Sequence, residues 1–199
     1  MIHTWLIKLR NSFLTIFGNI HLNNYFVWIP YYKPTSYKIK GKQTRELMAT
    51  VKPGDVMLRG YDDYVDGLFI GKWSHAALVL NETEVIHSMS QGVFRQDLLD
   101  FYRTDRICIL RPNLNADELK QVLAKAASME GLPYDFGFSF SDHPKEVYCS
   151  EFVYVSFEDF ATKLGMFKPQ EKVFGKLKVV VRPDAFLSYP GFANKYEFS

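Results

Sequence analysis

Two short runs of small and aliphatic residues, joined by a tight polar turn, restrict the fold of this chain more than any other feature. One run begins at His75 and reaches Leu80, and the other begins at Glu84 and contains His87. Their composition and the short turn between them predict an antiparallel hairpin. If Leu80 lies opposite Glu84, His87 lies opposite Ala77, on the same face as His75 and within diagonal cross-strand reach. A register shifted by one residue would separate the two histidines.

A second informative segment is the one in which a polar loop becomes an apolar helix. The loop contains several turn-forming residues with Pro144, and helical periodicity begins at about Tyr148 and continues to about Leu164. Cys149 is therefore expected near a helix N-terminus, where unpaired backbone amides stabilise a thiolate and can hold an oxyanion. A buried helix cysteine that acts only as a small hydrophobe fits the same segment.

The histidines and the cysteine together suggest nucleophilic catalysis. We expect Cys149 to be the nucleophile, His75 the base and His87 the group that orients the base. Each histidine taken alone also fits a core or edge histidine. Zinc binding is the competing hypothesis, with His143 or Asp142 as a fourth ligand. The spacing matches no compact zinc motif and no second cysteine lies nearby, so we expect neither a metal nor a cofactor.

The remaining elements are expected in the order of a mixed α+β domain. A helix is predicted near 43–50 and a strand after the Pro53-Gly-Asp turn. A third sheet strand is predicted from Gly92. The later predictions are a short helix over 96–102, a strand over 105–111, and a helix over 116–130 that is capped by Asn115 and ended by Gly131.

The composition is that of one globular domain. Of the 199 residues, 47% are hydrophobic and 16% are aromatic, which suffices for a sizeable core. We expect one domain over residues 1–199, with a motif-bearing core at about 50–165 and residues 1–45 as an extension. The 24 basic and 22 acidic residues are scattered and give a net charge of +2. This balance gives no support for nucleic-acid binding.

Location is predicted from the cysteines and from the N-terminus. Cys108 lies in a predicted buried strand, so no disulfide with Cys149 is expected and a cytoplasmic location is favoured. Residues 1–20 form an amphipathic pattern that suits either a helix packed on its own domain or a peripheral membrane contact. Lys8 and Arg10 interrupt the apolar run that a signal peptide needs, and no apolar stretch is long enough to span a bilayer.

Aromatic residues are expected to line the substrate groove. Tyr134 and Asp135 shortly precede the cysteine loop and either fill the core as turn residues or contact substrate. Tyr148, next to the cysteine, is predicted to bind substrate with them. The proline-punctuated segment 25–32 and the loop 60–72 are further candidates for determining specificity.

Five motifs in a fixed order resemble one known family. They are Pro-Gly-Asp at 53–55, Trp-Ser-His-Ala-Ala-Leu-Val at 73–79, Val-Ile-His at 85–87, Pro-Tyr-Asp at 133–135 and Tyr-Cys-Ser-Glu-Phe-Val at 148–153. Together they resemble the circularly permuted NlpC-type branch of papain-like cysteine peptidases, specifically the YiiX-like group. The resemblance implies an α+β papain-like fold, with an antiparallel sheet packed against a helix that carries the nucleophilic cysteine. It also implies cleavage of amide or similar acyl bonds without a metal.

Carried over residue by residue, the resemblance assigns the nucleophile to Cys149 and the base to His75. The third polar residue matches His87, where many YiiX-like proteins carry a glutamate. The expected function is a cysteine hydrolase that cleaves an amide bond, of peptide or isopeptide-like type, through a thioester, with a small peptide or acyl-amide as substrate. The His–His–Cys order also resembles the lecithin retinol acyltransferase-like group, so a lipid acyltransferase or hydrolase is the alternative, beside a non-catalytic ligand-binding protein. Nothing in the sequence indicates an oligomeric state.

Overall fold

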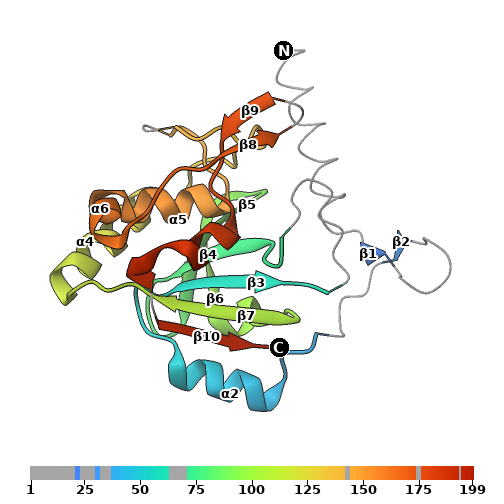
Figure 1. The fold of residues 1–199 in the computed structure, drawn as a ribbon. Coiled ribbons are helices and arrows are strands. Elements are labelled where there is room, and N and C mark those ends of the chain that lie inside the picture. The colour runs from blue at the N-terminus through green and yellow to red at the C-terminus, as the bar shows by residue number, and fades with distance from the viewer. Residues whose placement is uncertain are drawn as a thin grey trace.

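A six-stranded antiparallel sheet forms the centre of the molecule (Figure 1). The computed structural model describes residues 21–22, 30–31, 37–62, 71–141, 144–173, 176–192 and 194–199. The strand order is β10-β7-β3-β4-β5-β6. The bounds are β3 Val56–Gly60, β4 His75–Val79, β5 Glu84–Met89, β6 Gly92–Asp97, β7 Arg106–Arg111 and β10 Asn194–Phe198.

The predicted hairpin is confirmed in its register. Leu78 pairs with Ile86 and Val79 pairs with Val85 across β4 and β5. The Leu80 amide donates to the Glu84 carbonyl at 2.9 Å, which closes the turn as expected. Because side chains alternate between the faces of a strand, this register gives both histidines the same face.

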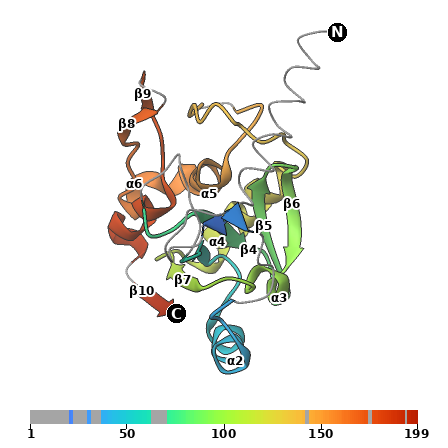
Figure 2. The ribbon, with the colours of Figure 1, turned by 90° about the vertical axis from the view of Figure 1, so that its right-hand side faces the viewer.

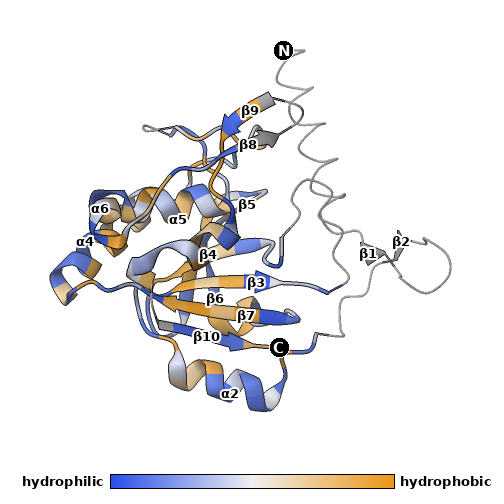
Figure 3. Ribbon diagram, viewed as in Figure 1, coloured by the Kyte–Doolittle hydropathy of each residue, from blue (hydrophilic) through white to orange (hydrophobic). Residues whose placement is uncertain are grey.

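Both faces of the sheet are covered. Helices α4 (Ala116–Ser128) and α5 (Cys149–Phe157) pack on one face, and α2 (Gly41–Thr50) and α3 (Leu98–Phe101) pack on the other (Figures 1 and 2). The central strands β3 and β4 are consequently buried along their whole length and contain the apolar runs Val56-Met-Leu and Ala76-Ala-Leu-Val, beside the polar residues Arg59 and His75. Most of β3 is orange in Figure 3. Such runs are typical of strands that are covered on two sides.

The cysteine helix is shorter than its sequence pattern predicts. The prediction of one helix to about Leu164 was wrong, because α5 ends at Phe157 and a 3-10 turn over Glu158–Phe160 leads to α6 (Ala161–Leu164). The Ser156 hydroxyl donates to the Phe152 carbonyl at 2.8 Å just before this point. Hydroxyl groups that bond back along a helix in this way tend to bend it. The apolar periodicity continues through the tighter turn, so periodicity alone does not reveal the break.

The C-terminal part adds elements that were not predicted. Strands β8 (Gln170–Val173) and β9 (Lys176–Val179) form a hairpin, 3-10 turns follow over Pro183–Ser188 and Pro190–Phe192, and β10 then pairs with β7. Strands β1 (His21–Leu22) and β2 (Pro30–Tyr31) pair near the other end. The predicted helix over 1–20 and most of the segment 25–32 lie outside the described residues. Within the described part, no helix has the length and hydropathy needed to cross a bilayer.

Candidate active site

The two predicted histidines meet in a buried contact. His75 is the first residue of β4 and His87 lies in β5, and the distance from His75 Nε2 to His87 Nδ1 is 2.8 Å. The ring of Phe101 lies 6.1 Å from the His75 ring and 5.7 Å from the His87 ring, and Phe94 lies 4.6 Å from the His87 ring. The pair therefore lies on the face of the sheet that α3 covers.

The surroundings of the pair favour uncharged imidazoles. Burial lowers the pKa of His75 well below its usual value and lowers that of His87 to about 3, and the positive charge of Arg59 lowers both pKa values further. Two neutral rings can share one hydrogen bond, in which His75 Nε2–H donates to His87 Nδ1. In that arrangement His75 keeps Nδ1 as a proton acceptor. His87 Nε2 is buried and has no hydrogen-bond partner in the structure.

Cys149 is the first residue of α5, as predicted, and is 7% exposed. The Ser88 hydroxyl donates to the Val147 carbonyl at 2.6 Å, so the end of β5 is held beside the start of α5. Figure 1 shows that α5 and β4 begin at the same side of the molecule. The histidine rings lie on the opposite face of the sheet from α5, and His75 is the first residue of β4. One contact of the Cys149 thiol is with the Ser150 hydroxyl, at 4.0 Å.

Glu151 is a site residue that the sequence analysis did not assign. Its carboxylate accepts the Ser141 amide at 2.9 Å and the Tyr148 amide at 3.4 Å, which ties the preceding loop to the first turn of α5. The side chain is fully buried, and burial raises its pKa to about 8. An acidic residue at the third helical position is a known capping signal, so the spacing from Tyr148 could have revealed this role.

The three predicted substrate-binding residues have different surroundings. Asp135 is buried and accepts the amides of Gly137 and Ser139 at 2.6 and 2.7 Å, so it builds the turn that precedes the cysteine loop. The buried Tyr148 hydroxyl accepts the Val181 amide at 3.0 Å. Tyr134 is half-buried and packs beside these residues. Substrate contact stays a prediction for all three.

Comparison with known proteins agrees with this architecture. Residues 50–194 match the model of a family described as permuted papain-like amidase enzyme, YaeF/YiiX, C92 family. The chain belongs to this C92 family. The crystal structure of metalloprotein yiiX from Escherichia coli O157:H7 is similar in fold, with a TM-score of 0.58 and 20% identity. The match covers 74% of this chain and 96% of that chain. No curated protein matches the sequence.

Membership of the C92 family confirms the predicted resemblance and the α+β papain-like fold. It also assigns the chain to the amidases of the cysteine hydrolase class, while the bond that is cleaved belongs to the proposal below. The family match begins where the predicted motif-bearing core begins and extends beyond it to residue 194, at the start of β10.

The structure also describes the surroundings of the second cysteine and bears on the zinc hypothesis. Cys108 is buried in β7, and burial raises the pKa of its thiol to about 11. Both cysteines are free thiols in the structure. Among the described residues, no group of three or more histidines, cysteines and acidic residues could hold a metal ion. His143 and Asp142, the predicted fourth ligands of the zinc alternative, lie outside the described residues.

Proposed function

We propose that this C92 amidase cleaves an amide bond through a thioester, with Cys149 as nucleophile, His75 as base and His87 as the group that orients the base. The observation that carries the proposal is the 2.8 Å contact between His75 Nε2 and His87 Nδ1. This contact uses the distal nitrogen of His75 and leaves Nδ1 to accept a proton from a thiol at the end of the sheet. A base held in this way by a third group is the general pattern of triads.

The chemistry follows from a neutral ground state. His75 Nδ1 takes the thiol proton as the sulfur attacks the amide carbonyl carbon, and backbone amides at the start of α5 stabilise the oxyanion. His75 then donates this proton to the leaving amine, and the acyl group stays on sulfur. Water, activated by the same imidazole, hydrolyses the thioester and restores the thiol. The lowered pKa values of both histidines favour proton transfer during attack over a preformed thiolate–imidazolium pair.

Thiol labelling tests the assignment of the nucleophile. We expect iodoacetamide at neutral pH to alkylate Cys149 much faster than Cys108, whose thiol is buried and has a raised pKa. Cys149→Ser should abolish the fast labelling and Cys108→Ser, the matched control, should preserve it. His75→Gln should slow it by removing the base. Equal and slow labelling of both cysteines in the folded protein would contradict the proposal.

An amide library tests the reaction itself. Turnover of a short peptide or acyl-amide should leave a trapped acyl group on Cys149 that mass spectrometry detects on acid quenching. Cys149→Ser should show neither turnover nor adduct. The same samples, treated with a chelator, should keep their activity, and zinc content measured by atomic absorption should be sub-stoichiometric. If amides stay intact while fatty acyl groups are released from phospholipid vesicles, the lipid alternative replaces this proposal.

A further inference from the structure

Arg59 is a buried cation beside the histidine pair to which the proposed reaction assigns no role. It lies in β3 directly opposite His75 in β4, and only 7% of its surface is exposed. Its guanidinium carbon lies 4.7 Å from the centre of the Phe101 ring, the same ring that contacts both histidines. Arg59 Nη2 also reaches the Met89 sulfur at 3.6 Å. The guanidinium and the two imidazoles thus all lie against the ring of Phe101.

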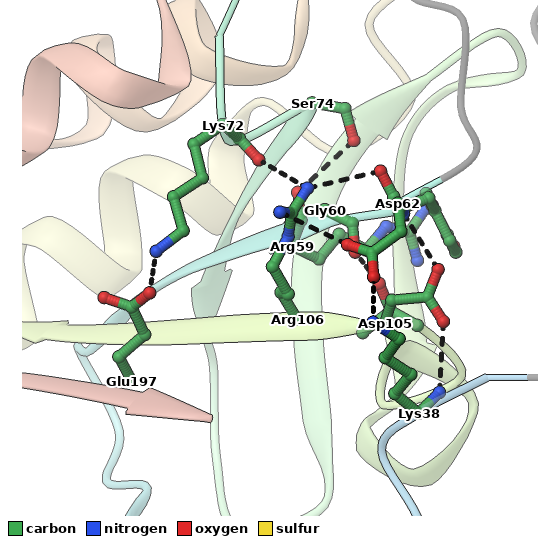
Figure 4. Close-up of polar contacts among 11 residues, drawn as sticks. Lys38, Arg59, Gly60, Asp62, Lys72, Ser74, Asp105, Arg106 and Glu197 are labelled. Atoms are coloured by element: carbon green, nitrogen blue, oxygen red, sulfur yellow. Dashed lines mark hydrogen bonds and ion pairs between the residues drawn. The ribbon is translucent and has the colours of Figure 1, made fainter. Parts of the chain in front are cut away.

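Among the residues that the structure describes, the guanidinium of Arg59 has no carboxylate partner of the kind that a buried cation needs. Arg59 Nε is buried without a hydrogen bond, and within the described ranges no carboxylate lies at ion-pair distance from the side chain. The neighbouring cations differ in this respect, as the dashed lines of Figure 4 show: Arg106 and Lys38 pair with Asp62, and Lys72 pairs with Glu197.

An unpaired guanidinium in such a site is unfavourable. Arginine stays protonated in proteins, so it cannot relieve the cost of burial by losing its charge. A ring face and a thioether sulfur offset only part of the lost hydration. The five N–H donors of a guanidinium fit a planar carboxylate in a bidentate fashion. The site therefore has the charge and donor geometry to accept one small anion next to the proposed base.

We propose that Arg59 binds a carboxylate of the substrate, so that this chain acts on amides that carry a carboxylate near the scissile bond. This inference rests on the proposed function, because it takes the bound carboxylate to be part of the substrate of that reaction. The ligand chemistry is set by a single buried guanidinium, which matches one negative charge.

Binding of the carboxylate also acts on the base. The groups that influence the His75 imidazole are Arg59 on β3 and His87 on β5, and Arg59 is the group that influences His87. A bound carboxylate cancels the charge of Arg59, so the pKa of both imidazoles rises. His75 becomes a stronger base when the substrate is in place. Arg59 is in this respect a positioning and tuning residue as well as a binding residue.

The test is an acetate titration followed by NMR, which needs no turnover. The Cε1–H resonances of the five histidines are recorded in the full chain and assigned with His75→Gln and His87→Gln variants. Acetate replaces chloride at constant ionic strength. We expect saturable shifts at His75 and His87 and a rise in their pKa. Arg59→Met should raise both pKa values without acetate and abolish the response. Arg103→Met, a change at an exposed arginine, should leave it intact.

Two further measurements keep the outcomes distinct. Arg59→Lys preserves the charge but not the bidentate geometry and should weaken acetate binding about tenfold, which covers the case in which Arg59→Met does not fold. Phosphate should compete poorly with acetate for Arg59. Silent histidine resonances in folded protein, a response that survives in Arg59→Met, or a response to phosphate alone would each overturn the inference. Acetate binding in a protein whose Cys149 does not react would instead contradict the proposed function alone.

Discussion

Replacing His87 by asparagine should change how the stability of this protein depends on pH. In the folded state burial lowers the pKa of His87 to about 3 from an ordinary value of 6.5. Below pH 6.5 the unfolded chain therefore binds a proton that the folded chain rejects, and acid favours unfolding. The stability linked to this residue is present above pH 6.5 and is lost as the pH falls toward 3. An asparagine at this position keeps an acceptor for His75 Nε2 but does not titrate.

The size of the effect follows from the two pKa values. Between about pH 6.5 and about pH 4.5, His87 should remove about 2.3 kcal/mol from the free energy of unfolding. Glu151 has the opposite effect on stability, because the pKa of its carboxyl group rises from 4.5 to about 8 on folding. Over the same interval the buried acid adds about the same amount of stability as the pH falls, since the folded state keeps the proton longer than the unfolded chain. The contributions of His87 and Glu151 nearly cancel in the unmodified protein, and His75, whose pKa is also lowered, adds to the slope that remains.

The assay is urea unfolding at 25 °C followed by circular dichroism, at a series of pH values across this interval. The informative quantity is the difference between unmodified protein and His87→Asn, because the contribution of Glu151 is common to both. That difference should change by about 2 kcal/mol in favour of the variant as the pH falls from about 6.5 to about 4.5. Parallel curves for the two proteins would refute a buried, neutral His87.

Three further outcomes test the neighbourhood of the site. Between about pH 6.5 and about pH 8, the free energy of unfolding of the unmodified protein should fall by about 1.6 kcal/mol, because Glu151 is fully ionised in the unfolded chain but only partly ionised in the folded one. Glu151→Gln should remove this fall in the same urea assay. Ser88→Ala should lower the free energy of unfolding by about 1–3 kcal/mol, because it leaves the buried Val147 carbonyl without its hydrogen bond. An unchanged urea midpoint would show that this hydrogen bond does not stabilise the fold. Asp55→Asn should lower the free energy of unfolding by about 3 kcal/mol, because the buried Asp55 carboxylate accepts hydrogen bonds of 2.8 and 2.7 Å from Arg111. A lower thermal midpoint would report this loss, and Asp100→Asn, at an exposed carboxylate, is the control.

The parts of the site that sequence could predict are those fixed by local rules. The hairpin turn sets the register of β4 and β5, so parity alone brings His75 and His87 to one face. The loop-to-helix change places Cys149 at the first position of α5. In both cases a few neighbouring residues decide the geometry.

The parts that could not be predicted depend on contacts between distant segments. Arg59 lies beside the histidines because β3 pairs with β4 across a long connection, and no local pattern sets that pairing. The capping contact of Glu151 with the Tyr148 amide is local, but its second contact exists only because the loop at Ser141 folds back onto the helix. The break after Phe157 is also hidden, because the 3-10 segment is only three residues long and a single turn is too short to show a change of apolar period.

The last strand has a consequence for how the chain is made. β10 pairs along β7, yet α4, α5 and the β8–β9 hairpin are all synthesised between the two strands. While the ribosome completes these elements, the β7 edge carries unpaired amides and carbonyls beside an apolar core. Such an edge is a template for intermolecular pairing. The interval between the synthesis of β7 and β10 is therefore the period in which the nascent chain most needs protection from its neighbours.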